Sequence, residues 1–177
     1  MRFPLNKKKV HGYKWGEKTW YNPAHLGTDW EANFVNLYAP CDGKISISEG
    51  PQAGKAIQFI PKGQEPLIIR WLHLSKHIAK IGVVKEGQIL AITGNSGTSG
   101  QASFPHLHED IWPKGKVDIN NFKLTINPEE YWKMSQFKTQ NYKGELRIIL
   151  QADSMITWEA ICKVYGVDPK IIDETIT

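Results

Sequence analysis

Short segments in which apolar and polar residues alternate, each bounded by glycine or proline, recur through the first part of the chain. The clearest is Gly43–Ser48, which lies between the turn pairs Asp42-Gly43 and Gly50-Pro51. Side chains of a β-strand point alternately to opposite faces, so the pattern predicts strands with one buried face. Two further segments, at 55–60 and 67–73, are joined by a connection short enough for a hairpin. We therefore expect a mainly β fold built on an antiparallel sheet or sandwich.

The chain is expected to divide into a large and a small part. Asn127-Pro128-Glu129-Glu130 has an N-cap residue, a proline in the first helical position and acids in the first turn. This predicts a short helix that closes a first domain, 1–134. Residues 135–144 are polar and are interpreted as a linker. The remaining segment, 145–177, begins with a strand-like run and continues with apolar residues at helical spacing, which predicts a small helical unit.

Composition and charge narrow the class of protein. Apolar residues make up 41% and charged residues 23% of the chain, as in ordinary globular proteins. The net charge of +4 suits an anionic partner such as a bacterial wall polymer and is too small to indicate nucleic acid. No apolar stretch follows the three lysines at 7–9, so we expect no signal peptide and no membrane insertion.

The segment Pro105-His106-Leu107-His108 carries the strongest chemical signal. On a strand, both imidazoles lie on one face, roughly 7 Å apart, while Leu107 points into a core. One such histidine can hold a metal while the other lies beside its open position. His25 and Asp29 add the nitrogen and oxygen ligands of a catalytic zinc site, which has three protein ligands and a free position.

A further histidine, His73, lies in the strand-like segment Trp71-Leu72-His73-Leu74-Ser75. The chain has no His-Glu-x-x-His motif and so lacks the glutamate base of the helical zinc peptidases. Imidazoles can transfer protons near neutral pH, because their ordinary pKa is about 6.5. His106 and His73 are the natural candidates for that task.

Four motifs, taken in order, resemble those of the lysostaphin/LytM-type zinc metalloendopeptidases, and the resemblance covers roughly residues 10–134. They are His25-x-Gly27-x-Asp29, Leu72-His73-Leu74-Ser75, Gly94-Asn95-Ser96-Gly97 and Pro105-His106-Leu107-His108. The resemblance implies an active-site groove and one Zn²⁺ per chain, held by His25, Asp29 and His108. It implies that His73 and His106 transfer protons and stabilise the transition state beside the metal.

The resemblance also implies a substrate and a place of action. Members of the family cleave peptide bonds in the stem peptides or cross-bridges of peptidoglycan. We expect a monomer that acts at the bacterial cell wall, on the extracellular or periplasmic side. A phage lysin or virion-associated wall hydrolase is the first interpretation, and a secreted bacterial enzyme that has lost its leader is the second.

Three residues depart from the family pattern or leave it uncertain. The family has an apolar residue and then an acid after the second histidine, whereas this chain has Glu109 and Asp110. Glu109 would share the buried face of Leu107, at a cost that an edge position, a bulge or an early end of the strand would relieve. Asp110 would share the histidine face and could contact a metal ligand. Tyr21 is the nearest candidate for a tyrosine that assists the oxyanion, or else a groove-wall aromatic.

The tail and the choice of function leave alternatives open. Residues 158–168 resemble the helical part of a LysM peptidoglycan-binding module, and an incomplete module could bind glycan or pack on the first domain. A non-catalytic wall-binding or regulatory protein of the same fold is the main alternative to an enzyme. A zinc hydrolase with an unrelated substrate is the third reading, because a fold does not fix a function.

Overall fold

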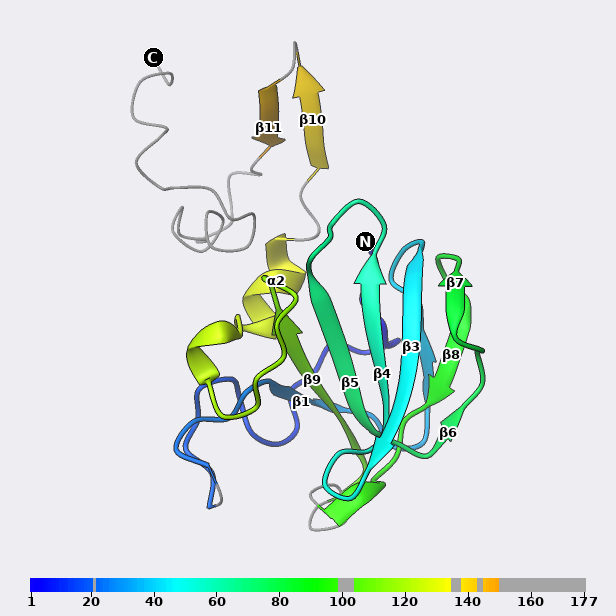
Figure 1. Ribbon diagram of the computed structural model, residues 1–177, viewed down its shortest axis with the longest axis vertical. Helices are drawn as coiled ribbons and strands as arrows, with labels where there is room; N and C mark the ends of the chain where they lie inside the picture. Colours follow the sequence, from blue (N-terminus) through cyan, green and yellow to red (C-terminus); the bar gives the residue numbers. More distant parts are fainter. Residues whose placement is uncertain (21, 99–103, 135–137, 143–144, 150–177) are drawn as a thin grey trace. The chain divides into compact units, whose positions relative to one another are not determined.

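The computed structural model describes residues 1–20, 22–98, 104–134, 138–142 and 145–149 (Figure 1). The chain divides into two compact units, Met1–Pro128 and Glu129–Thr177. The first unit contains every residue of the expected metal and catalytic set.

An antiparallel sheet of six strands forms the framework of the first unit (Figure 1). Its strand order is β1-β9-β5-β4-β3-β7, so β9 lies between β1 and β5 in the interior of the sheet. The strands are β1 (Thr28–Glu31), β3 (Gly43–Gly50), β4 (Gly54–Pro61), β5 (Ile68–Leu74), β7 (Gly82–Val84) and β9 (His106–Trp112). The sequence-based prediction of a mainly β, antiparallel fold is confirmed.

A second antiparallel sheet has the order β2-β8-β6. It is made of β2 (Asn36–Tyr38), β8 (Ile89–Ile92) and β6 (Lys76–His77). Both sheets contribute fully buried side chains to the core, among them Leu37 and Leu90 from the small sheet and Ile57, Phe59 and Trp71 from the large one. Burial of this apolar surface is the main driving force for the fold.

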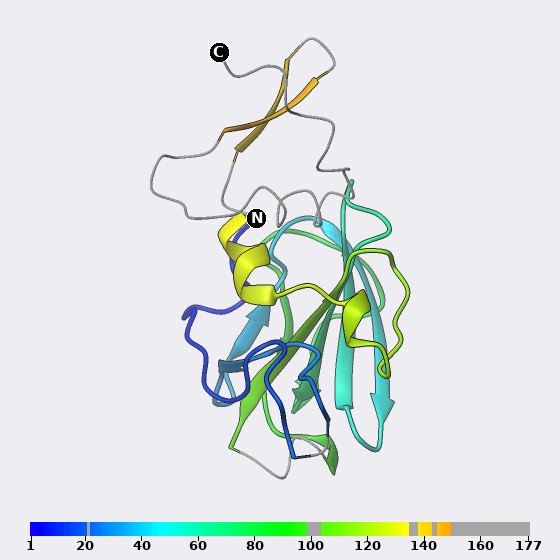
Figure 2. The ribbon, with the colours of Figure 1, turned by 90° about the vertical axis from the view of Figure 1, so that its left-hand side faces the viewer.

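The N-terminal segment, dark blue in Figure 2, runs beside β1. His11 N–H donates to the carbonyl of Asp29, and Asp29 N–H donates to the carbonyl of Tyr13, both at 2.9 Å. A third bond runs from Glu31 N–H to the Lys9 carbonyl, at 2.8 Å. Residues 9–13 thus extend the backbone ladder outward from the strand that carries Asp29.

The expected helix at Asn127-Pro128 is present as α2 (Pro128–Met134), preceded by the 3₁₀ turn η1 (Phe122–Leu124). Within the segment 135–144, interpreted as a linker, Lys138–Tyr142 forms strand β10 and pairs antiparallel with β11 (Glu145–Ile149). A ladder is held by backbone hydrogen bonds, which polar residues make as well as apolar ones. The LysM-like segment at 158–168 lies outside the described residues.

No helix in the described part of the chain is both long enough and apolar enough to cross a membrane.

Candidate metal and catalytic site

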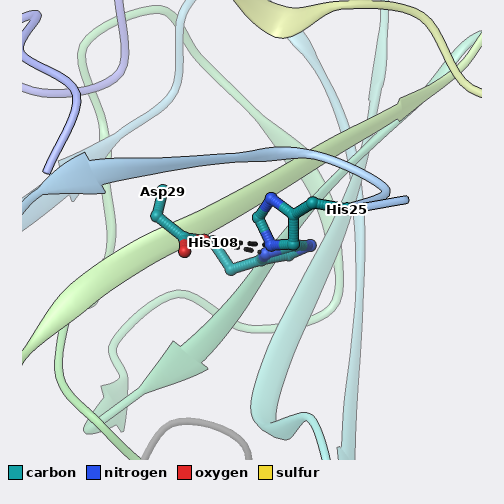
Figure 3. A group of neighbouring side chains, drawn as sticks. All are labelled: His25, Asp29 and His108. Carbon is teal, nitrogen blue, oxygen red and sulfur yellow. Dashed lines mark hydrogen bonds and ion pairs between the residues drawn. The ribbon is translucent and has the colours of Figure 1, made fainter. Parts of the chain in front are cut away.

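The pairing of β1 with β9 places Asp29 directly opposite His108. The close approach of these strands depends on Gly27, because a Cβ there would lie 1.9 Å from the carbonyl oxygen of Glu109. A glycine two residues before Asp29 therefore lets the chain reach the backbone of β9. His25 precedes the strand and points back toward the same place (Figure 3).

His25, Asp29 and His108 form a compact cluster (Figure 3). The Asp29 Oδ1 atom lies 3.0 Å from His108 Nδ1 and 3.5 Å from His25 Nε2. One ligand atom from each residue lies within 4.8 Å of the other two, and all three residues are buried. Two imidazole nitrogens and one carboxylate oxygen, converging in this way, match the donor set of a catalytic zinc site.

The second oxygen of Asp29 is held by the N-terminal segment. Tyr13 N–H donates to Asp29 Oδ2 at 3.1 Å. Gly12 makes room for this contact, because a Cβ at Gly12 would lie 2.9 Å from Asp29 Oδ2. Sequence reasoning missed Gly12 and Tyr13, and the glycine-tyrosine pair alone carries no signal that it lies against a carboxylate. The predicted Tyr21 lies outside the described residues.

Asp110 lies on the histidine face of β9, as strand alternation predicted. Its Oδ2 atom is 3.5 Å from His108 Nε2. It also accepts two hydrogen bonds from Arg70, from Nε at 2.7 Å and from Nη2 at 2.5 Å, and one from Trp112 Nε1 at 2.5 Å. A carboxylate beside the second nitrogen of a ligating histidine fixes the orientation and tautomer of the ring.

His73 and His106 lie next to the cluster. Their ring centroids are 5.1 Å apart, and His106 Nε2 is 3.7 Å from Asp29 Oδ1. His73 Nδ1 lies 3.0 Å from the Ser96 carbonyl oxygen, and His106 Nδ1 lies 2.9 Å from that of Phe104. A carbonyl can only accept, so each neutral ring carries its proton on Nδ1 and its lone pair on Nε2.

His73 has an unusual backbone conformation, with φ at +63°. The register of β4 and β5 shifts near this residue, between Lys55 and Ile57. Ser96 ties the irregular region together: its Oγ accepts from Lys55 N–H at 2.9 Å and donates to the Leu74 carbonyl at 2.6 Å. Strained backbone of this kind persists where surrounding contacts hold it, and it is common at functional sites.

Burial sets the charge of three histidines. Burial, followed by the charge on His108, lowers the pKa of His25 to about 4 and that of His73 to about 3. Burial also lowers the pKa of His106. All three rings are therefore neutral near pH 7, the form that binds metal or accepts a proton.

His108 has the opposite tendency. Burial alone would lower its pKa, but contacts with Asp110 and Asp29 raise it to about 9. Burial would raise the pKa of both carboxyls, but His108 lowers that of Asp29 to about 2, and Arg70 with His108 lowers that of Asp110 to about 2. In the metal-free protein an imidazolium therefore lies between two carboxylates. A metal ion that binds at His108 Nδ1 must displace a proton.

These pKa values predict how the stability of the metal-free protein varies with pH. From pH 6.5 to 9 the folded state holds a proton on His108 that the unfolded state has lost, so stability falls as pH rises. From pH 6.5 downward the unfolded state protonates His25 and His73 first, so stability falls as pH falls. Urea midpoints of chelator-treated protein should therefore peak near pH 6.5. A midpoint that rises steadily up to pH 9 would contradict this.

Glu109 is fully buried on the other face of β9. Its carboxylate accepts hydrogen bonds from the indole N–H groups of Trp30, at 2.7 Å, and Trp71, at 2.8 Å. We expected an edge position, a bulge or an early end of the strand to relieve the cost of burying this carboxylate, and all three expectations are wrong. Strand β9 is an interior strand that runs on to Trp112, and its register with β1 and β5 is continuous at Glu109. Neutral donors from the two neighbouring strands satisfy the carboxylate instead.

A cavity of about 320 Å³ adjoins the cluster. His25, His73 and His108 line it together with residues of the sheet and of the surrounding loops. The ligand cluster therefore has an accessible side from which a substrate and water can approach.

Comparisons with known proteins place the chain in a family. Residues 23–120, more than half of the chain, match the model of peptidase family M23. The peptidoglycan DD-endopeptidase ShyA of Vibrio cholerae is 32% identical over 105 residues, which are 58% of this chain and 23% of that protein. The chain thus spans about a quarter of the length of this curated relative.

Comparison with solved structures also finds peptidases. The catalytic domain of lysostaphin from Staphylococcus simulans superposes with a TM-score of 0.59 at 26% identity, over 69% of this chain and 90% of that one. A zinc-containing peptidase from Vibrio cholerae superposes with a TM-score of 0.54 at 27% identity, over 66% of this chain and 39% of that one. The resemblance drawn from the four sequence motifs is confirmed, and the chain belongs to peptidase family M23.

Proposed function

We propose that this protein is a zinc-dependent endopeptidase that hydrolyses peptide bonds in the stem peptides or cross-bridges of peptidoglycan. The observation that carries the proposal is the cluster of His25, Asp29 and His108, whose ligand atoms lie within 4.8 Å of one another beside an accessible cavity. A relative whose name states a peptidoglycan endopeptidase activity and a zinc-containing structural neighbour support it.

His25 Nε2, Asp29 Oδ1 and His108 Nδ1 would hold the zinc ion. When bound, the ion would polarise the scissile carbonyl and lower the pKa of water at the site. Tyr13 and Asp110 keep two of the ligands in place, Tyr13 through Asp29 Oδ2 and Asp110 through His108 Nε2. These contacts restrict the rotation of the ligand side chains and so favour a single coordination geometry.

His73 and His106 would carry the proton transfers. Each presents a lone pair on Nε2 because Nδ1 faces a backbone carbonyl. One imidazole accepts the proton of the water that attacks the scissile carbonyl, and the proton then passes to the leaving amine as the C–N bond breaks. The other ring, neutral before reaction, would accept a hydrogen bond from the same water and so orient it. The lowered pKa of both rings keeps them in the accepting form before reaction.

The test is digestion of purified sacculi of several wall chemotypes by the zinc-loaded protein, with mass spectrometry of the released fragments. New peptide termini, lost on chelation and in the Asp29→Ala variant, are the expected result and would also name the bond. Glu86→Ala, which removes an exposed acid outside the cluster, serves as the matched control. No release from any wall type by folded, zinc-loaded protein would overturn the proposal in favour of a wall-binding or regulatory role.

A further inference from the structure

The cavity beside the ligand cluster has a distinct chemical lining. Its lining includes Arg70, Leu72 and Asp110 of the sheet and the carboxamide residues Asn22, Gln52 and Asn120. Carboxamides offer both donors and acceptors, so the preference of the cavity depends on its charged groups.

The two charged groups in this lining, apart from the histidines, are Arg70 and Asp110. Asp110 is fully buried, and its two carboxylate oxygens already accept hydrogen bonds from Arg70 and Trp112 and lie near His108 Nε2. It therefore presents little acceptor capacity to a ligand. The charges of Asp110 and Arg70 offset each other at close range, so the hydrogen-bonding groups that remain decide what the cavity prefers.

Arg70 differs from Asp110 in its exposure and in the hydrogen-bonding capacity that it has left. Its side chain retains 12% exposure, and its bonds to Asp110 use Nε and Nη2. The geometry of a guanidinium directs the remaining Nη1 hydrogens away from such a bidentate pair. Among the described residues that line the cavity, no second acid faces these donors. The cavity therefore favours an acceptor-rich, anionic group over a cation.

Arg70 shares the cavity with the candidate metal ligands. It is paired with Asp110 across β5 and β9, and Asp110 Oδ2 lies 3.5 Å from His108 Nε2. His25 and His108 line the same cavity, so a group bound at Arg70 lies in the space that adjoins the cluster.

We propose that this cavity binds a free carboxylate of the peptide substrate, close to the scissile bond, with Arg70 as the charged contact and Gln52 in the same lining. The proposal rests on the endopeptidase function and specifies its substrate: a peptide with a free acid near the cleaved bond is preferred over the same peptide with a carboxamide. A charge-assisted hydrogen bond of this kind gives a preference of roughly 10-fold to 100-fold in kcat/KM.

The experiment compares two synthetic peptides that differ in this one group, acid against amide, with the cleaved sequence taken from the sacculus digestion. Gln52 is exposed on the cavity wall, which allows its charge to be changed without disturbing the fold. Gln52→Glu should lower the acid-to-amide ratio of kcat/KM by roughly fivefold, and Gln52→Lys should raise it by a similar factor. Asn36→Glu and Asn36→Lys, exposed on β2, control for net charge.

The outcomes separate this proposal from the proposed function. Equal kcat/KM for acid and amide in the wild-type protein, or a ratio that the Gln52 variants leave unchanged, would overturn the carboxylate site while hydrolysis itself stands. If no peptide is hydrolysed, a binding measurement still tests the carboxylate site. NMR titration of the zinc-loaded protein with both short peptides should show tighter binding of the acid than of the amide, at resonances near Arg70. Equal affinity would overturn the proposal there too.

Discussion

Alanine at His108 is expected to abolish both metal binding and hydrolysis, whereas alanine at His106 should abolish hydrolysis and leave the metal bound. His108 Nδ1 lies 3.0 Å from Asp29 Oδ1 and belongs to the ligand cluster. His106 Nε2 lies 3.7 Å from the same oxygen and outside that cluster. Loss of the metal should lower kcat/KM on the order of 10³-fold or more, and loss of the imidazole alone roughly 10²-fold to 10⁴-fold.

The two variants separate in metal content rather than in activity. Zinc per chain, measured by mass spectrometry of the dialysed proteins, should fall toward zero for His108→Ala and stay near one for His106→Ala. His77→Ala, on β6 and outside the cluster, should retain both zinc and activity. If His106→Ala lost the metal and His108→Ala kept it, the roles assigned to the two histidines would be reversed.

A second large effect is expected in stability, from leucine at Glu109. The substitution leaves the indole N–H groups of Trp30 and Trp71 without their carboxylate acceptor in a fully buried environment. Each such unsatisfied donor costs about 1–3 kcal/mol, so the free energy of unfolding should fall by roughly 2–6 kcal/mol. Urea unfolding of the zinc-loaded proteins measures this difference.

A combined variant distinguishes lost hydrogen bonds from poor packing. Adding Trp30→Phe and Trp71→Phe to Glu109→Leu removes both donors, so part of the lost stability should return, although two smaller rings fill the space. Glu86→Leu, at an exposed position, should change stability by less than about 0.5 kcal/mol. A Glu109→Leu protein as stable as the wild type would show that the indole contacts contribute nothing net.

Features set by local pattern were predictable from the sequence. Alternation along β3 and along His106-Leu107-His108 gave the strands and the face on which the histidines lie, because side-chain direction in a strand follows from residue number alone. The turn residues between Ile60 and Leu67 gave the hairpin. The proposed ligand set was also chosen from the sequence, because histidine and aspartate are residue types that bind zinc, and the structure brings the three residues together.

Contacts between distant strands were not predictable in the same way. The indole partners of Glu109 lie on β1 and β5, and the guanidinium partner of Asp110 lies on β5. Which side chains meet depends on strand order and register, which a single sequence does not specify. The pairing of β10 with β11, inside and after the segment 135–144 that was interpreted as a linker, was not foreseen for a related reason, since it is made by backbone groups that polar and apolar residues share.

The backbone ladder between residues 9–13 and β1 bears on where this domain begins. The match to the family model starts at residue 23, beyond Gly12 and Tyr13. A chain trimmed to the matched residues would keep all three ligands but lose the N–H group that holds Asp29 Oδ2. The boundary of the match to the family model and the boundary of a fully oriented candidate metal site therefore differ, and a unit that retains these hydrogen bonds to Asp29 reaches back to His11.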